Sequence, residues 1–349
     1  MRNQRTRLNH DDYKVGWVCA LAKEMVAATA MLDELHAALP LPANDSNNYT
    51  LGRVGDHNVV VACLPVGEMG NNSSATVATR LTSTFPAIRF GVMVGIGGGV
   101  PPAVRLGDVV VSTPGDGYGG VVQWDFGKTE QHGFRRIGSL DSPPTILKTT
   151  LSTLRVRHEM EGLKIPDILK EVENKWPRLV PKYTRRDGLE DVLFAPDCPH
   201  VETAADADAE QPSSCTACDG ERTIRRTPRE MQIHYGLIAS GNQVVKDGVF
   251  RDQINRHLGG KVLCFEMESA GLMNEFRCVV VRGICDYADS HKNKQWQEHA
   301  AMVAAATAKE IVLAVAASDV KQMSPVGRTP HLRASRTVSS SQGAYSSTK

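Results

Sequence analysis

Two short apolar runs near the C-terminus, each ending abruptly in carboxylates, constrain the fold more than any other feature of this chain. The first covers residues 264–271 and carries Glu266 and Glu268, and the second covers 279–286 and ends at Asp286. Their length and their aliphatic content predict two buried strands. In an open α/β sheet the carboxyl ends of the strands face the crevice where ligands bind. The sequence therefore predicts an α/β fold with an acidic site for a hydroxylated ligand and for proton transfer.

A purely structural interpretation of these acids competes with the functional one. A carboxylate just past a strand often caps the next helix, or is favoured in its first turn by the helix dipole. This interpretation fits Glu266, Glu268 and also Glu24, which begins a predicted helix after the first predicted strand. It fits Asp286 less well, because no clear apolar helix follows that residue.

The rest of the chain alternates predicted strands and helices. Three consecutive glycines, at 97–99, end one of the strands, but they lack the Lys-Ser/Thr of a P-loop, and Pro101 and Pro102 stand where a dinucleotide fingerprint requires a helix. These glycines instead predict the close approach of a ligand or of another backbone. The predicted strands cover 15–20, 49–53, 59–65, 92–100 and 106–112, with a last one from 235 that ends in Ser-Gly-Asn at 240–242. The predicted helices cover 23–39, 75–85, 144–160, 269–276 and 296–317.

Composition argues against several classes of partner. The formal net charge is +1 and aromatic residues make up 5% of the chain, so we expect neither nucleic acid nor a membrane to be bound. The most apolar late stretch, 300–317, is interrupted by Lys309 and Glu310, which argues against a membrane-spanning helix. Most cysteines lie beside apolar runs without the spacing of a disulfide framework, which favours a reducing, cytoplasmic location.

The segment from about 175 to 230 departs from the alternating pattern. It is rich in Pro, Asp, Arg and Ser, and it is typical of an insertion or a lid within the main domain, which is predicted to cover residues 13–318. Residues 1–12 form an N-terminal extension, and residues 319–349 are predicted to be a disordered tail. Within the insertion, Cys198, His200, Cys215 and Cys218 have the ligand types and spacing of a structural zinc site, although ordinary loop thiols fit them as well.

Taken in order, several motifs resemble one known superfamily. They are Glu24 after a glycine-bearing strand, GIGGGV at 95–100, LGDVVVS at 106–112, GVVQWDFGK at 120–128, IHYGLIASGNQ at 233–243, CFEMESAGLMN at 264–274 and VVVRGICDYADSHKNKQW at 279–296. The chain resembles the purine nucleoside phosphorylase and nucleosidase superfamily, and especially the fungal domains of this kind found at the N-terminus of NLR-like immune receptors. The resemblance implies a three-layer α/β/α sandwich around a mixed, partly barrel-like central sheet.

The resemblance also implies roles for individual residues. Asp286 is expected to protonate N7 of a leaving purine, and Glu24 to position or deprotonate a nucleophilic water. Glu268 is expected to bind the ribose 2′ and 3′ hydroxyls, with Met267 against the sugar and base. The other residues predicted to bind substrate are Phe265, Gly97, Gly98, Asn242, Val244 and Arg282.

The expected nucleophile is water. Ile96 occupies the glycine turn where phosphorolytic members commonly carry a hydroxyl residue, and Glu24 would repel a phosphate anion. We therefore expect a hydrolase that acts on an adenine nucleotide or nucleoside. ATP is the favoured substrate, because some members of the fungal group cleave ATP to adenine and ribose 5-triphosphate. The residues predicted to hold the phosphates are Arg185, Arg186, Arg225, Lys246 and Lys292.

Two other functions fit the same residues. One is a purine nucleoside phosphorylase that uses inorganic phosphate, and the other is a non-catalytic module that senses a nucleotide. No cofactor is expected for catalysis. The resemblance implies a homo-oligomer, either a dimer or a larger ring, but leaves open the preferred purine and the signal that activates the protein.

Overall fold

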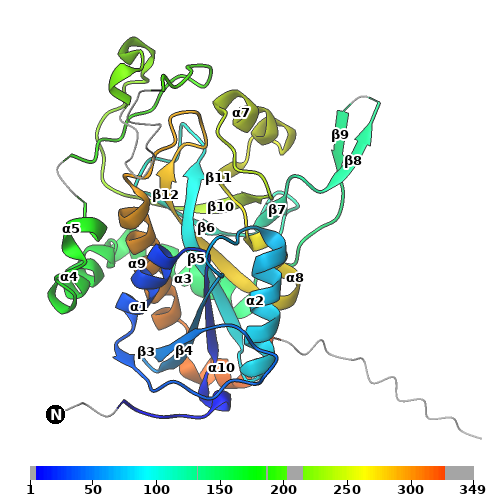
Figure 1. Cartoon of the computed structure of the whole chain (residues 1–349), viewed down its shortest axis with the longest axis vertical. Coiled ribbons are helices and arrows are strands. Elements are labelled where there is room, and N and C mark those ends of the chain that lie inside the picture. The colour runs from blue at the N-terminus through cyan, green and yellow to red at the C-terminus, as the bar shows by residue number, and fades with distance from the viewer. Residues whose placement is uncertain (1–4, 132, 186–187, 203–214, 327–349) are drawn as a thin grey trace, which may run out of the picture.

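A mixed β-sheet forms the centre of the computed structural model, which describes residues 5–131, 133–185, 188–202 and 215–326 (Figure 1). The strand order is β11-β10-β6-β12-β5-β1-β4-β3-β2, and β7 also pairs with β10. Because β11 pairs with the end of β5 as well as with β10, part of the sheet closes into a barrel. The strands are β1 (Val15–Cys19), β2 (Glu34–Leu35), β3 (Tyr49–Val54), β4 (His57–Cys63), β5 (Phe90–Gly99), β6 (Val109–Ser112), β7 (Val121–Gln123), β10 (Ile233–Ser240), β11 (Val262–Glu266) and β12 (Cys278–Asp286).

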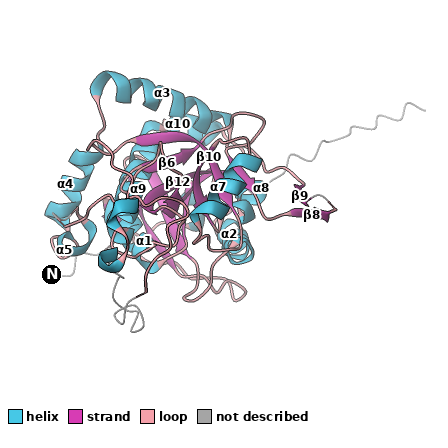
Figure 2. Ribbon diagram, turned by 90° about the horizontal axis from the view of Figure 1, so that it is seen from above, coloured by secondary structure: helices cyan, strands magenta, loops and turns pink. Residues whose placement is uncertain are grey.

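Helices cover both faces of this sheet (Figures 1 and 2). On one face α9 packs against β12 and β5, and α1, α3, α4 and α5 contact α9. On the other face α2 packs with α8. The predicted three-layer sandwich around a mixed, partly barrel-like sheet is therefore confirmed. The helices are α1 (Ala22–Met31), α2 (Asn71–Thr84), α3 (Thr145–Glu161), α4 (Ile165–Lys175), α5 (Val180–Tyr183), α7 (Gly248–His257), α8 (Met273–Phe276), α9 (Gln297–Ala314) and α10 (Ala317–Gln322).

The central strands are apolar throughout because both faces of the sheet are covered. In β12, Val279 and Val281 belong to the core beneath α9, whereas Val280 belongs to the core beneath α2. Trp17 and Val18 of β1 divide between the two cores in the same way. Successive side chains of a strand point to opposite faces, so a strand buried on both sides appears in the sequence as a continuous apolar run.

Some element boundaries differ from the sequence-based predictions. The helix predicted over 23–39 ends at Met31, and β2 follows, pairing antiparallel with β3. The predicted helix includes Leu32 and Leu35, but the structure places Leu35 in β2, because two apolar residues three apart do not distinguish the two periods. The strand predicted to end in Ser-Gly-Asn at 240–242 does end there, at Ser240. The predicted 269–276 helix is divided into a 3₁₀ turn, Ser269–Gly271, and α8.

The two ends of the described chain pack against the domain. The predicted tail from residue 319 begins inside α10, where Val320 is buried. The backbone N–H of Val326 donates a hydrogen bond to the carbonyl of Ile88. At the other end, the Thr6 hydroxyl donates to Glu34. The ordered domain therefore extends beyond residue 318 as far as the described chain can be followed, because these residues bury apolar surface.

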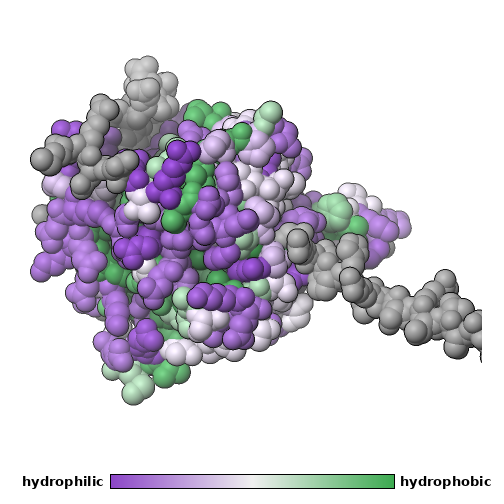
Figure 3. Space-filling model, turned by 90° about the horizontal axis from the view of Figure 1, so that it is seen from below, coloured by the Kyte–Doolittle hydropathy of each residue, from purple (hydrophilic) through white to green (hydrophobic). Residues whose placement is uncertain are grey.

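A second small sheet and the outer surface complete the description. β8 (Gly127–Glu130) and β9 (Gly133–Arg136) form an antiparallel pair that projects from the body (Figure 1). Hydrophilic residues cover most of the face seen from below, with smaller apolar patches between them (Figure 3). Among the described residues, no helix combines the length and the apolarity that crossing a bilayer requires.

Candidate active site

A cavity of about 230 Å³ lies where β1, β5 and β11 end. Its wall comes from the strand ends themselves and from the segments that follow β1, β4, β10 and β12. This is the crevice that the acid-tipped strands predict. The predicted site residues that line it are Glu24, Gly97, Gly98, Val244, Phe265, Met267, Glu268 and Lys292.

The glycine run at the end of β5 lets other groups approach this wall closely. A Cβ on Gly97 would lie 2.4 Å from the Cys264 sulfur and 3.0 Å from the Phe265 carbonyl oxygen, so the closure of the barrel leaves no room for one. A Cβ on Gly98 would lie 2.8 Å from Asp286 Oδ1. Glycine at these positions therefore allows β11 to pair with β5 and leaves the Asp286 carboxylate next to the cavity wall.

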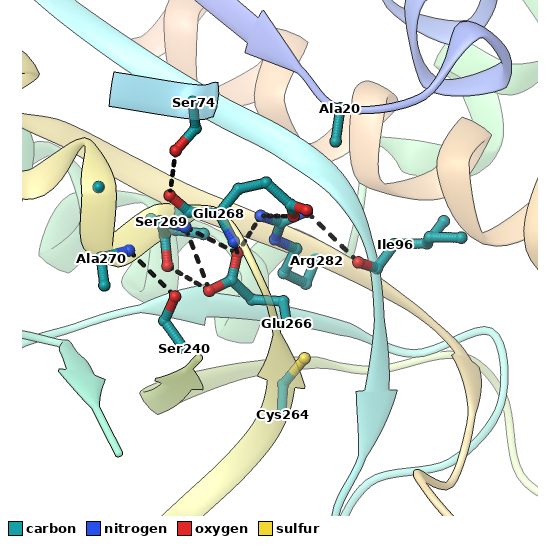
Figure 4. Close-up of polar contacts among 12 residues, drawn as sticks. Ala20, Ser74, Ile96, Ser240, Cys264, Glu266, Glu268, Ser269, Ala270 and Arg282 are labelled. Carbon is teal, nitrogen blue, oxygen red and sulfur yellow. Dashed lines mark hydrogen bonds and ion pairs between the residues drawn. The ribbon is translucent and has the colours of Figure 1, made fainter. Parts of the chain in front are cut away.

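Arg282 occupies the centre of a buried ionic cluster beneath the cavity (Figure 4). Its guanidinium pairs directly with Glu266, lies 3.4 Å from Glu268 Oε2, and interacts with the charge of Glu24. Although burial opposes its charge, these carboxylates raise the pKa of Arg282, which therefore remains a cation. Gly95 makes space for the cluster, since a Cβ there would lie 2.5 Å from both Arg282 Nη1 and Glu24 Oε1.

Glu266 and Glu268 have different tasks although they are two residues apart. The Glu266 carboxylate accepts hydrogen bonds from the backbone N–H and the hydroxyl of Ser269 and pairs with Arg282 (Figure 4). Those contacts fit the structural interpretation of this acid. The Glu268 carboxylate lines the cavity and accepts only a long bond, 3.3 Å, from the Gly70 N–H and the weaker contact with Arg282. It therefore keeps capacity to accept hydrogen bonds from a ligand.

Glu24 is held by three backbone donors. Its Oε2 accepts from the N–H groups of Ala20 at 2.8 Å and Leu21 at 2.9 Å, and its Oε1 accepts from Ile96 at 2.8 Å. Burial raises the pKa of Glu24, while Arg282 and these three donors oppose the rise. Such bonds fix the carboxylate at the cavity wall in one orientation, and a raised pKa suits a group that accepts a proton near neutral pH.

Asp286 lies at the end of β12, next to Gly98 of the cavity wall. Its Oδ1 accepts from the Ala288 N–H at 2.9 Å, and its Oδ2 pairs with Lys292 Nζ at 3.1 Å. Burial lowers the pKa of Lys292, but Asp286 outweighs this effect and the net shift is upward. Lys292, predicted to bind phosphate, therefore lies in the cavity wall as the charge partner of Asp286.

The chain is similar to several known proteins. A model described as the phosphorylase superfamily matches residues 14–168, which include β1, β5 and Glu24. The matched residues, somewhat less than half of the chain, are similar to that superfamily. An NLR-like protein of Hyaloscypha variabilis is 42% identical over 330 residues, which are 91% of this chain and 31% of that protein, so the chain spans about a third of that relative. A 5′-methylthioadenosine/S-adenosylhomocysteine nucleosidase of Mycobacterium tuberculosis is 24% identical over 308 residues, covering 85% of this chain and 95% of the relative.

Several solved structures show a similar fold. Futalosine hydrolase of Helicobacter pylori superposes with a TM-score of 0.53 at 16% identity, covering 87% of this chain and 99% of that one. The 5′-methylthioadenosine/S-adenosylhomocysteine nucleosidase of Neisseria meningitidis, in complex with methylthio-immucillin-A, gives a TM-score of 0.54 at 17% identity, covering 86% and 98%. At these identities the likeness establishes the fold.

Several predicted site residues, Asp286 and Arg282 among them, lie outside the cavity wall. Asn242 accepts a hydrogen bond from the Asn71 N–H at 3.0 Å and so helps to begin α2. Arg185 packs over the Trp296 ring, 5.9 Å from its centroid. Arg225 and Lys246 are exposed and do not line the cavity. Arg186 lies outside the described residues. The phosphate-binding role of this group stays a prediction.

Other residues in the wall were not predicted. Met69 and Gln243 come from the loops after β4 and β10, and Gln297 comes from the start of α9. The sequence offers only a weak signal for them, because each lies in a loop or at a helix end that many folds contain. For Gln243, the indication in the sequence is its position directly after Asn242, a predicted site residue.

The raised pKa of Glu268 predicts an unusual dependence of stability on pH. Burial, with Glu266 and Glu24 nearby, raises this pKa from 4.5 to about 7, although Arg282 opposes the shift. In the unfolded chain the carboxyl ionises near 4.5, so the folded state is favoured at lower pH and loses that advantage as the pH rises through about 7. A shift of this size corresponds to roughly 3 kcal/mol of unfolding free energy.

We expect Glu268→Gln to be more stable than the parent protein at pH 8 and to differ much less from it at pH 5. Urea unfolding of both proteins at the two pH values measures this difference. Glu159→Gln, which removes an exposed carboxylate from α3, is the control for loss of charge. An identical pH dependence in the parent and in Glu268→Gln would show that Glu268 ionises normally.

Proposed function

We propose that this domain hydrolyses the N-glycosidic bond of an adenine nucleoside or nucleotide. The observation that carries the proposal is that Glu24 and Glu268 line one cavity at the strand ends, while the Asp286 carboxylate lies behind Gly98 of the same wall. Relatives named as methylthioadenosine/S-adenosylhomocysteine nucleosidases and futalosine hydrolase support the same reaction class.

The ribose occupies the part of the cavity next to Glu268. The Glu268 carboxylate accepts hydrogen bonds from the sugar hydroxyls, and Met267 and Phe265 provide apolar contact in the same wall. As the glycosidic bond lengthens, the sugar gains the positive charge of an oxocarbenium ion. The nearby carboxylates of Glu268 and Glu24 stabilise that charge more than they stabilise the neutral substrate, which lowers the barrier.

Proton transfer takes place on two sides of the sugar. Glu24 accepts a proton from a water whose oxygen attacks C1′ as the C1′–N9 bond breaks. The bonding electrons pass to the purine, and N7 receives a proton through Asp286. That proton comes from the Lys292 ammonium group, 3.1 Å from the Asp286 carboxylate, so the pair ends as a neutral amine beside the carboxylate. The fixed contacts of Glu24 and Asp286 hold both groups in place before the substrate binds.

The charges around the cavity support water rather than phosphate as the nucleophile. Among the described residues that line it, Lys292 is the one Lys or Arg, and it already pairs with Asp286. Glu24, Glu266 and Glu268 line the same cavity. A phosphate ion between them would meet several carboxylates and one engaged cation, which is unfavourable at short range.

The residues of the cavity wall bear differently on two classes of substrate. ATP is the substrate proposed from the motifs of the fungal group, and it requires cations beyond the cavity wall to meet its phosphates. The apolar residues Leu21, Met69 and Val244, which line the wall and are 36%, 55% and 47% exposed, favour a nucleoside with an apolar 5′ substituent, such as methylthioadenosine.

A chromatographic assay of free base tests the proposal. The full chain is incubated with ATP, AMP, adenosine, methylthioadenosine or inosine, with and without added phosphate, beside Asp286→Asn. We expect release of adenine that does not depend on phosphate, and a loss of roughly 10²- to 10⁴-fold in rate for the variant. Release only with phosphate would indicate a phosphorylase, and no release from any substrate would exclude the enzymatic proposal.

A further inference from the structure

Three soft metal-ligand side chains converge in the insertion, outside the proposed active site. One ligand atom from each of His200, Cys215 and Cys218 lies within 4.8 Å of the other two. His200 Nδ1 is 3.2 Å from Cys218 Sγ and 4.0 Å from Cys215 Sγ. Ligands around a tetrahedral zinc ion are separated by roughly 3.5 to 3.8 Å, given the usual Zn–N and Zn–S bond lengths. The cluster therefore already has the dimensions of a zinc site.

We propose that His200, Cys215 and Cys218, with Cys198 as the fourth ligand, bind one structural Zn²⁺ that fixes the insertion onto the segment bearing Asp286 and Lys292. Thiolate and imidazole ligands together select zinc over Mg²⁺ or Ca²⁺, which prefer oxygen. Cys198 is two residues before His200 and is buried, and its sulfur lies outside the cluster of the other three, so it must move toward them to complete the site. Four protein ligands close the coordination sphere, as in structural rather than catalytic sites.

The surrounding fold explains why a metal is useful there. Between residues 188 and 230 the described chain has two 3₁₀ turns, Cys215–Ala217 and Gly220–Arg222, and an isolated bridge between Phe194 and Thr223. Few apolar side chains of this region are buried, so packing alone provides little stability. A metal that joins 198–200 to 215–218 closes the intervening loop and removes part of the entropy of the unfolded chain.

The proposed site also touches the catalytic segment. The His200 ring lies edge-on to His291, with ring centroids 5.6 Å apart, and His291 stacks on Phe194 at 3.7 Å. The Ser290 hydroxyl donates a hydrogen bond to the Cys198 carbonyl at 3.0 Å. Lys292, the partner of Asp286, directly follows His291 in the chain. Metal binding therefore holds in place the segment that supplies this cation.

Metal analysis of the purified full chain tests the assignment without reference to activity. We expect about one zinc per chain after dialysis against a weak chelator. His200→Ala, Cys198→Ser, Cys215→Ser and Cys218→Ser should each weaken zinc binding by at least about tenfold. Cys63→Ser, a half-buried cysteine of β4 outside the insertion, is the matched control and should keep its metal. A metal-free parent protein, or full zinc retention by the four variants, overturns the site, and retention by Cys198→Ser alone overturns the fourth ligand.

Two further measurements guard against variants that fail to fold and separate this inference from the proposed function. Reconstitution of the parent chain with Co²⁺ should give a thiolate-to-cobalt charge-transfer band, and absence of the band contradicts thiolate ligation. Hydrogen exchange of residues 286–292 should become faster when the metal is removed. Unchanged exchange overturns the link to the catalytic segment. If the parent protein passes these tests but releases no adenine, the zinc site stands and the proposed function is contradicted. Only the effect of the metal on catalysis rests on the proposed function.

Discussion

Glu24→Gln is expected to lower kcat/KM for the purine substrate by roughly 10²- to 10⁴-fold, the usual contribution of one positioned base. The amide cannot accept a proton from the attacking water. The NH₂ group of the amide would also face at least one of the three backbone N–H donors that hold the carboxylate. Two of these donors bind Oε2 and the third binds Oε1, so either orientation of the amide leaves a donor without an acceptor. We therefore expect an additional loss of about 1 to 3 kcal/mol in unfolding free energy.

Initial rates of base release and urea unfolding of the same preparations separate the two effects. The pH profile provides a further check. Because the raised pKa of Glu24 belongs to a base that must be ionised, kcat/KM of the parent protein should fall as the pH decreases through that pKa. Glu159→Gln on the exposed face of α3 is the control and should leave both quantities unchanged. A Glu24→Gln enzyme with parental kcat/KM would exclude Glu24 as the base.

Arg282→Met is expected to destabilise the domain by roughly 3 to 5 kcal/mol, the cost of breaking a buried ion pair by removing one partner. The guanidinium is the cation that Glu266, Glu268 and Glu24 share, and its side chain is almost fully buried. Without it, the carboxylates remain close together in a poorly hydrated cluster. Some of these carboxylates must then be protonated for the domain to remain folded.

Urea unfolding at pH 5 and pH 8 measures this effect. The loss should be larger at pH 8, because the carboxylates can be protonated at the lower pH. Adding Glu266→Gln to Arg282→Met should recover part of the lost stability, since it removes the carboxylate that pairs most closely with the guanidinium. Arg178→Met, an exposed site near α4, is the matched control. Equal stability of Arg282→Met and the parent protein would show that the cluster does not depend on Arg282.

The motifs predict the general position of the site because the strands that carry it can be recognised from short stretches of sequence. Glu24, Glu268 and Asp286 each follow an apolar run, and the length and composition of such a run specify a buried strand. Because strands of this length end near one edge of the sheet, the acids at their ends can be assigned to one crevice before any contact is known. The glycines at 97–99 likewise signalled a close approach, which proved to be that of β11.

The tertiary structure decided which partner each of these residues has. Glu266 and Glu268 look equivalent in the sequence and both line the cavity, but Ser269 and a close ion pair with Arg282 engage the first, while the second has only longer contacts with described residues. Lys292 forms an ion pair with Asp286, and Asn242 accepts a hydrogen bond from Asn71 at the start of α2. Such pairings join segments far apart in the chain, and they depend on strand register and on closure of the barrel. The sequence by itself determined which segments are buried strands and that acidic residues follow them. Only the assembled sheet determined which acidic and basic side chains form ion pairs.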